Sequence, residues 1–182
     1  MTKLEEAILE GAKTAQKDYF NMTGGYWLWH GPEYFISYTV AMKLKEEKFL
    51  VYPEASPKKI MEGRGERPKG RPAGNLGQRF DLVIWEKTTD NIKAVLEIKQ
   101  AWDIAGLKSD REKISKFIKQ KQYVKSGYLL AYTEAKGVKR VQTLENRLKN
   151  WEAGLACTLV GSHIDEQGDG DYSWAFGLFR IL

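Results

Sequence analysis

Three ionisable residues interrupt two otherwise apolar stretches of the sequence. Asp81 lies within residues 80–85, and Glu97 and Lys99 lie within residues 93–100. Both stretches have the β-branched and aromatic composition of strands. Because strand side chains alternate between the two faces of a sheet, Glu97 and Lys99 should share one face. This pattern therefore predicts that two carboxylates and one ammonium group lie close together in the core.

Charges in such strands are costly to bury unless they are paired or bind a metal. Two carboxylates with a nearby lysine could hold a hard divalent cation, which prefers oxygen ligands. Two simpler interpretations remain open from the spacing alone. The residues could form a salt bridge across adjacent strands, or they could lie on a half-exposed sheet face where each charge meets water.

Several other kinds of site are excluded by spacing. The chain has two histidines, His30 and His163, and neither has a second His or Cys at the spacing of a zinc site. A glycine-rich stretch at 65–70 is followed by Arg and Pro where a phosphate-binding loop needs Lys and Ser or Thr. An acidic loop at 165–170 resembles a calcium loop, but Phe176 occupies the position of its last carboxylate.

The composition favours a single soluble domain spanning residues 1–182. The chain has 182 residues, of which 42% are hydrophobic and 29% are charged. The N-terminus lacks the apolar core of a signal peptide, and no apolar run approaches the ~20 residues of a membrane span. A single cysteine, Cys157, allows no internal disulfide. We therefore expect a cytoplasmic protein with no membrane partner.

The net charge of +5 is concentrated in two segments. Residues 58–79 and residues 108–125 each contain seven basic and two acidic residues. Such clusters favour a polyanionic partner, although they could also be solvated lysines on a loop and a helix face. The candidate nucleic-acid-binding residues are Lys58, Lys59, Arg64, Arg67, Lys69, Arg71, Arg79, Lys113 and Lys116.

Hydrophobic periodicity and turn residues predict the secondary structure. We expect helices over 2–20 (stopped by Gly24-Gly25) and 33–47, one opened by a capping box at 109–112, and one marked by residues 138–151. We expect strands at 49–52 (ended by Pro53), 80–85, 93–100, 128–132, 157–163 and 172–181. This order predicts an α/β fold with a mixed central β-sheet flanked by helices. The first three strands should form a meander, and a helical crossover should lead to the fourth.

Asp81 followed by Glu97-Ile98-Lys99 on the next strand resembles the PD-(D/E)xK nuclease superfamily. The similarity extends over about residues 32–132, which would form a restriction-endonuclease-like core (αβββαβ). The helix at 2–20 and the helix and strands at 137–181 would then be additions. Phe80 stands where the family motif has proline. That proline is the element of the motif least needed for chemistry.

The resemblance implies a Mg²⁺-dependent nuclease, with Mn²⁺ as a substitute, whose expected substrate is DNA rather than RNA. Asp81 and Glu97 would bind the metal together with the backbone carbonyl of Ile98, and Lys99 would complete the catalytic set. An upstream acid, either Glu33 or Glu54, could assist. Glu33 could instead be a favourable charge in a first helical turn, and Glu54 an exposed loop residue.

Two further questions stay open at this level. The alternative function is a non-catalytic nucleic-acid- or protein-binding module that retains the nuclease fold. Aromatic residues at 26–30 and 34–35 could stack on bases or could close the core against the first helix. A homodimer would be the simplest way to cut both strands of a duplex, but no residue pattern identifies an interface.

Overall fold

The structure is a computed structural model that describes residues 1–63, 78–86, 92–119, 124–166 and 171–181. Within these ranges the elements follow one another in the order α1 (Lys3–Thr23), η1 (Leu28–His30), α2 (Glu33–Glu46), β1 (Leu50–Ala55), α3 (Pro57–Gly63), β2 (Phe80–Trp85), β3 (Ile92–Gln100), α4 (Ala105–Ile118), β4 (Val124–Lys136), α5 (Arg140–Leu155), β5 (Thr158–Ile164) and β6 (Tyr172–Ile181).

The six strands form one mixed sheet in the order β1-β2-β3-β4-β6-β5. β1, β2 and β3 form an antiparallel meander, and β3 pairs with β4 in parallel. The connection between these two parallel strands contains α4, which packs over both. The prediction of a mixed α/β sheet with a meander and a helical crossover is confirmed.

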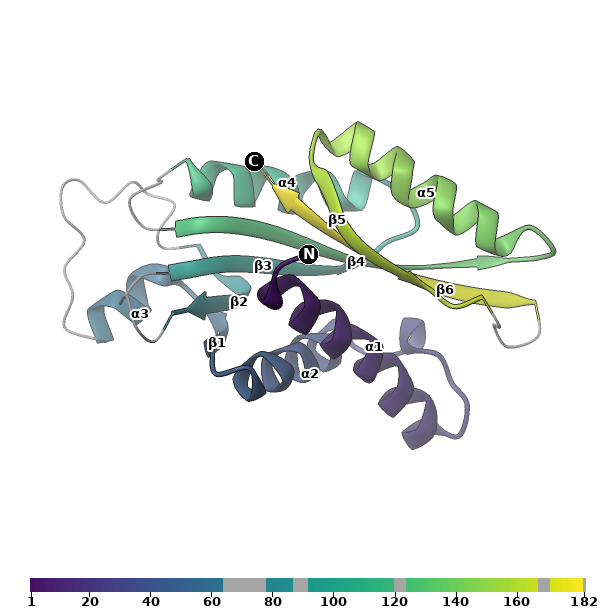
Figure 1. Ribbon diagram of the computed structural model, residues 1–182, viewed down its shortest axis with the longest axis horizontal. Coiled ribbons are helices and arrows are strands. Elements are labelled where there is room, and N and C mark those ends of the chain that lie inside the picture. The colour runs from purple at the N-terminus through teal and green to yellow at the C-terminus, as the bar shows by residue number, and fades with distance from the viewer. Residues whose placement is uncertain (64–77, 87–91, 120–123, 167–170, 182) are drawn as a thin grey trace.

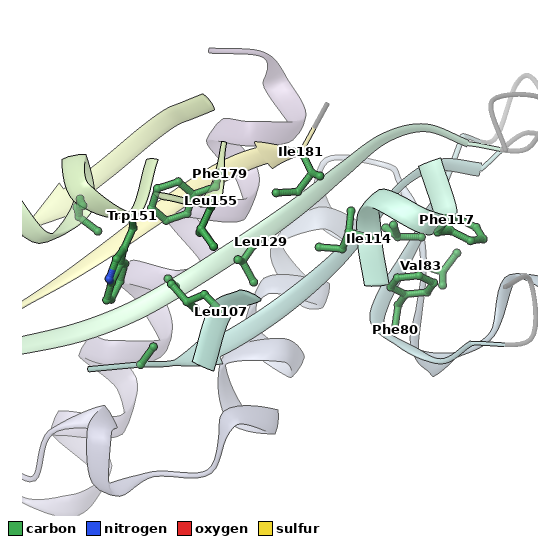
Figure 2. Packing of buried hydrophobic residues seen from close by; sticks show 14 of the residues in the cluster. Phe80, Val83, Leu107, Ile114, Phe117, Leu129, Trp151, Leu155, Phe179 and Ile181 are labelled. Carbon is green, nitrogen blue, oxygen red and sulfur yellow. The ribbon is translucent and has the colours of Figure 1, made fainter. Parts of the chain in front are cut away.

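Helices cover both faces of this sheet, so the protein has three layers (Figure 1). On one face, side chains of α1 and α2 pack against Leu82, Ile84 and Leu96. On the other face, side chains of α4 and α5 pack against Val83 and Val95, and Figure 2 shows part of that cluster. Burial on both faces explains why the central strands read as nearly continuous apolar runs.

The ends of α1 follow from local chemistry. The side chain of Thr2 accepts a hydrogen bond from the Glu5 backbone N–H, and the Glu5 carboxylate accepts one from the Thr2 N–H, which makes a capping box. Gly24 ends the helix with φ = 70°, a left-handed conformation that glycine adopts without strain. The expected glycine stop is confirmed.

The predicted start of α4 is wrong. The helix begins at Ala105, four residues before the Ser109 expected to cap it. The carboxylate of Asp103 accepts hydrogen bonds from the N–H groups of Ala105 (2.9 Å) and Gly106 (3.3 Å). Asp103 thus satisfies the first free amides of the helix, and the capping-box pattern at 109–112 lies inside it.

β1 also differs from the prediction, because it continues through Pro53 to Ala55. β1 is the outermost strand of the sheet, where a residue without an N–H group removes no hydrogen bond to a further strand. The Gly, Pro, Lys and Arg content of residues 55–78 predicts a long loop, but the short helix α3 occupies Pro57–Gly63 of this segment. Val138, expected on a helix, precedes α5 and is 99% exposed. The sequence Thr-Thr-Asp-Asn at 88–91 predicts a turn between β2 and β3, and these four residues lie outside the described residues.

Helix α4 lies so close to the sheet that β4 needs a glycine beneath it. A Cβ atom on Gly127 would collide with Ile114 and lie 3.0 Å from the Cγ2 atom of Ile118. Both isoleucines belong to the inner face of α4. This close approach holds the helix against β3 and β4.

We predict that Gly127→Ala lowers the free energy of unfolding by about 1–3 kcal/mol, the usual effect of overpacking a core. Urea unfolding followed by circular dichroism would measure it. Gly106→Ala is the control, because nothing lies within 4 Å of a Cβ there and alanine is the better helix former. Equal losses in the two variants would contradict the close packing of α4 on β4.

Candidate active site

Asp81 and Glu97 lie side by side on two neighbouring strands. In the antiparallel pairing of β2 with β3, Leu82 is the partner of Leu96. Continuing the register by one residue places Asp81 opposite Glu97. Alternation directs both side chains to the α4 face of the sheet, where Val83 also lies. The structure therefore brings together the two carboxylates singled out from the sequence.

The Asp81 carboxylate also connects the two strands. Its Oδ2 atom accepts a hydrogen bond of 2.7 Å from the backbone N–H of Ile98. The Ile98 N–H lies beyond the last backbone pair between β2 and β3, so a side chain takes the place of a backbone carbonyl. A donor that would otherwise need another partner is thereby satisfied.

Burial raises the pKa of both carboxyl groups. Removal from water raises the pKa of Asp81 to about 6, with the Ile98 N–H acting against the shift and the charge of Glu54 adding to it. Glu97 is 5% exposed, and removal from water raises its pKa to about 8, with the charge of Asp81 adding to the shift. The doubly charged form of the pair is therefore unfavourable, and a nearby positive charge would stabilise it.

Two lysines supply positive charge beside this pair. Lys113 from α4 forms an ion pair with Oε1 of Glu97, and its ammonium lies 4.9 Å from the centre of the Phe80 ring. Lys99, on the same strand face as Glu97, lies 3.1 Å from Oε1 of Glu33. Burial opposes the charged form of Lys99, but its hydrogen bond to Glu33 and the charge of Glu33 raise its pKa.

Glu33 fastens the start of α2 to the end of β3. Besides pairing with Lys99, its Oε1 accepts a 3.0 Å hydrogen bond from the Gln100 N–H. The Gln100 side chain then donates to the carbonyl oxygens of Leu28 (2.7 Å) and Gly31 (3.2 Å). Glu33 thus contacts the candidate lysine directly and is also a carboxylate in a first helical turn.

Glu54, the other candidate upstream acid, has different surroundings. Its carboxylate pairs with Arg79 at 3.3 Å, and both side chains are more than half exposed. The backbone of Glu54 has φ = 48°, a conformation uncommon for residues other than glycine. Its charge raises the pKa of Asp81 more than the charge of Glu33 does. The structure thus places Glu33 beside Lys99, whereas Glu54 acts on Asp81.

The described part of the chain contains no group of three or more His, Cys, Asp or Glu side chains arranged to hold a metal ion. The donors that lie together are the two carboxylates of Asp81 and Glu97. Two adjacent, poorly solvated carboxylates are suitable ligands for a hard cation, and a protein often supplies only one or two carboxylates to Mg²⁺. The site therefore fits a cation that completes its coordination with water and substrate.

The predicted nucleic-acid-binding residues that the structure describes lie on α3, just before β2 and on α4. Lys58 and Lys59 are exposed on α3, with Lys58 3.8 Å from Glu62. Lys116 is exposed on α4, whereas Lys113 on the same helix points to Glu97. The remaining candidates are Arg79, which pairs with Glu54, and Arg64, Arg67, Lys69 and Arg71, which lie outside the described residues.

Two contributors were not recognised in their present roles from the sequence. Lys113 was expected to contact phosphate groups, but it neutralises Glu97. Asp110, not selected at all, lies one helical turn before Lys113, and burial raises its pKa while Lys99 and Lys113 lower it. The spacing of Asp110 and Lys113 places both on one side of α4, which was the available signal.

Comparisons with known proteins identify no family for this chain. No family model matches it, and no curated protein or solved structure is significantly similar. The described residues contain no helix that is both long and apolar enough to cross a membrane.

The raised pKa of Glu97 predicts how stability depends on pH without divalent cations. Between its ordinary value of 4.5 and the folded value of about 8, the folded protein binds this proton more tightly than the unfolded chain. Stability should fall as pH rises through this range. Glu97→Gln should flatten the dependence, measured by urea unfolding in EDTA.

Lys113→Gln is the matched comparison for that experiment. It removes the positive partner of Glu97 and so raises the pKa of this carboxyl further, and the loss of stability should therefore continue to higher pH than in the parent protein. Parallel pH profiles for the parent protein and Glu97→Gln would show that burial does not perturb this carboxylate.

Proposed function

We propose that this protein is a metal-dependent nuclease of the PD-(D/E)xK type, built on a restriction-endonuclease-like core, that hydrolyses phosphodiester bonds, with DNA as the preferred substrate. The observation that carries the proposal is the convergence of Asp81, Glu97 and Lys99 on one face of two adjacent strands. The meander and helical crossover around them follow the order that the motif resemblance implies.

Asp81 and Glu97 would hold Mg²⁺ or Mn²⁺ with the Ile98 carbonyl. The Ile98 N–H points to Asp81. In an extended strand, the C=O of the same residue points to the same neighbouring strand. When bound, the cation would polarise the scissile phosphate, lower the pKa of a bound water and stabilise the leaving oxygen.

Lys99 would orient the attacking water and offset the negative charge that develops on the phosphate. Its ion pair with Glu33 supports this role, because the pair keeps the ammonium charged and fixes its position. Glu33 would then be a positioning residue that acts through Lys99. The exposed basic residues Lys58, Lys59 and Lys116 would contact the phosphate backbone without reading sequence.

A second candidate function is a nucleic-acid-binding module that does not cleave. The ion pair between Lys113 and Glu97 favours it, because Lys113 neutralises a carboxylate that a metal would otherwise occupy. On this alternative, the parent protein would bind nucleic acid equally with and without Mg²⁺ and would cut neither DNA nor RNA.

We predict that Asp81→Asn and Glu97→Gln abolish Mg²⁺-dependent nicking of plasmid DNA and weaken Mg²⁺ binding measured by calorimetry. Each change removes one negative ligand, while the fold should persist because both replacements keep nearly the same shape. Glu112→Gln is the control, since Glu112 is an exposed carboxylate on α4. Cleavage that survives both substitutions would rule out the assigned metal site.

We predict that Lys99→Ala lowers the turnover rate by about 10²-fold or more, the effect of losing one transition-state donor. Mg²⁺ affinity should persist because lysine is not a ligand, and nucleic-acid affinity should change little. Single-turnover cleavage and fluorescence anisotropy in Ca²⁺ would measure the two properties. A variant that cuts at the parental rate would refute this role for Lys99.

A further inference from the structure

A separate pocket of about 450 Å³ lies at the end of the sheet beyond β3. It is lined by Trp27, Trp29, His30, Trp102, Glu134 and Tyr172. These residues come from the η1 segment, the chain just after β3, the end of β4 and the start of β6. Figure 1 shows the ends of β4 and β6 together at one end of the sheet. A volume of this size is typical of sites for small ligands.

Aromatic rings form most of its wall. The ring centres of Trp29 and Trp102 are 4.2 Å apart, and those of Trp27 and Tyr172 are 6.2 Å apart. Trp102 is 50% exposed and Tyr172 is 41% exposed, so their rings are not closed into the core. Leu28 between the two η1 tryptophans is fully buried and anchors the segment. A large aromatic surface held open to solvent is typical of a binding site.

One carboxylate faces this aromatic wall. Glu134 lines the pocket but is only 5% exposed. The Tyr132 hydroxyl donates to its Oε1 atom at 2.8 Å, and a carboxylate has the capacity to accept further hydrogen bonds. A buried carboxylate is stabilised by further hydrogen bonds, so a ligand that donates to Glu134 would bind favourably here.

Burial raises the pKa of the Glu134 carboxyl, and the Tyr132 hydroxyl and the charge of His30, which also lines the pocket, act against that shift. Arg147 does not pair with this carboxylate. Arg147 donates to the backbone carbonyl of Glu134 and to the Thr133 hydroxyl, not to the carboxylate. Its guanidinium lies 5.9 Å from the Trp102 ring, on which it packs. Arg147 therefore fixes the pocket wall and leaves the acceptor capacity of Glu134 available.

The pocket is joined directly to the candidate active site. Gln100 bonds to the Leu28 and Gly31 carbonyls on either side of Trp29, and Glu33 bonds to both Gln100 and Lys99. Trp102 follows Lys99 by three residues and lies just after the end of β3, so the two Cα atoms are separated by at most roughly 10 Å, the length of three extended residues. This is close enough for one nucleic-acid strand to reach both places.

We propose that this pocket binds one unpaired nucleobase, with guanine preferred, so that the substrate is single-stranded or locally unpaired nucleic acid. The identity of the ligand rests on the proposed function, which brings a nucleic-acid strand to the adjacent site. Tryptophan rings stack on any base. Guanine offers two adjacent donors, N1–H and the N2 amino group, that match a carboxylate. The other bases present one donor beside an acceptor that would repel it.

The test uses short oligothymidylates, with or without one central guanine, bound in EDTA so that no cleavage occurs. The parent protein should bind the guanine-containing strand more tightly. Trp102→Ala should weaken binding of both strands by about 10-fold, the effect of losing one stacked base. The control is Tyr38→Ala, which removes an aromatic ring that is 60% exposed on α2 outside the pocket.

Glu134→Gln tests the carboxylate separately. The amide keeps an acceptor for Tyr132 but replaces the second acceptor with a donor. Stacking affinity should remain while the preference for guanine disappears. Unchanged affinity in Trp102→Ala, or an unchanged preference in Glu134→Gln, would overturn the assignment. Displacement by tetramethylammonium at lower concentration than by guanosine monophosphate would also overturn it, because the pocket would then be a cation cage.

The failure of this proposal and that of the nuclease proposal give different results. A parent protein that never cleaves, yet binds guanine-containing strands through Trp102, would refute the nuclease and retain the pocket. If the parent protein cleaves and the Trp102→Ala variant binds and cuts as the parent does, the nuclease proposal stands and the pocket assignment is refuted.

Discussion

Two carboxylates, Asp81 and Glu97, are taken out of water side by side on one face of the sheet, and the surrounding structure compensates for their charge. The Ile98 N–H donates to Asp81, and the Lys113 ammonium pairs with Glu97. Even so, the pKa of each group stays raised, to about 6 and about 8. Burial thus outweighs the stabilising partners. A fold under selection for stability alone would gain by replacing such a pair with apolar residues, which is why the site invites a functional explanation.

The sheet can accommodate the pair because its backbone ladder changes at this point. The backbone pairing of β2 with β3 ends at Leu82 and Leu96. Beyond this pair, the Asp81 carboxylate accepts the hydrogen bond of the Ile98 N–H in place of a backbone carbonyl. On the other edge of β3, the parallel pairing with β4 continues to Gln100. β3 is therefore held rigidly on one side and opened on the other. A rigid strand beside an open edge is well suited to hold charged groups in fixed positions.

Much of the fold could be predicted from local patterns. β2 and β6 have the predicted bounds because each is an apolar run between polar segments. The shared face of Glu97 and Lys99 follows from strand alternation alone. The start of α4 could not be predicted as easily, since a single capping residue, Asp103, competes with a fuller capping pattern that lies inside the helix.

Contacts between distant segments were beyond such reasoning. Lys99 and Glu33 are 66 residues apart in the chain, and no local pattern relates them. The aromatic pocket needs four segments to meet. The sequence does show the tryptophans and Tyr26 near the end of α1, but it cannot separate rings that face solvent from Leu28, which turns into the core. Composition shows which side chains are available, whereas tertiary packing decides which of them remain open to a ligand.

The two lysines at the site differ in what a cation would do to them. Lys113 forms an ion pair with the Glu97 carboxylate, which a metal would also need. Any metal ion that binds Glu97 would therefore compete with the Lys113 ammonium. Lys99 is held by Glu33, a carboxylate outside the Asp81–Glu97 pair, and can keep its position whether or not a metal binds. Lys113 also extends from a helix that carries the exposed Lys116, on a basic stretch of the sequence. On the proposed function, charge balance would couple metal binding to substrate binding: a divalent cation at the carboxylates would free the Lys113 ammonium, and a phosphate group is the anion whose arrival would compensate it.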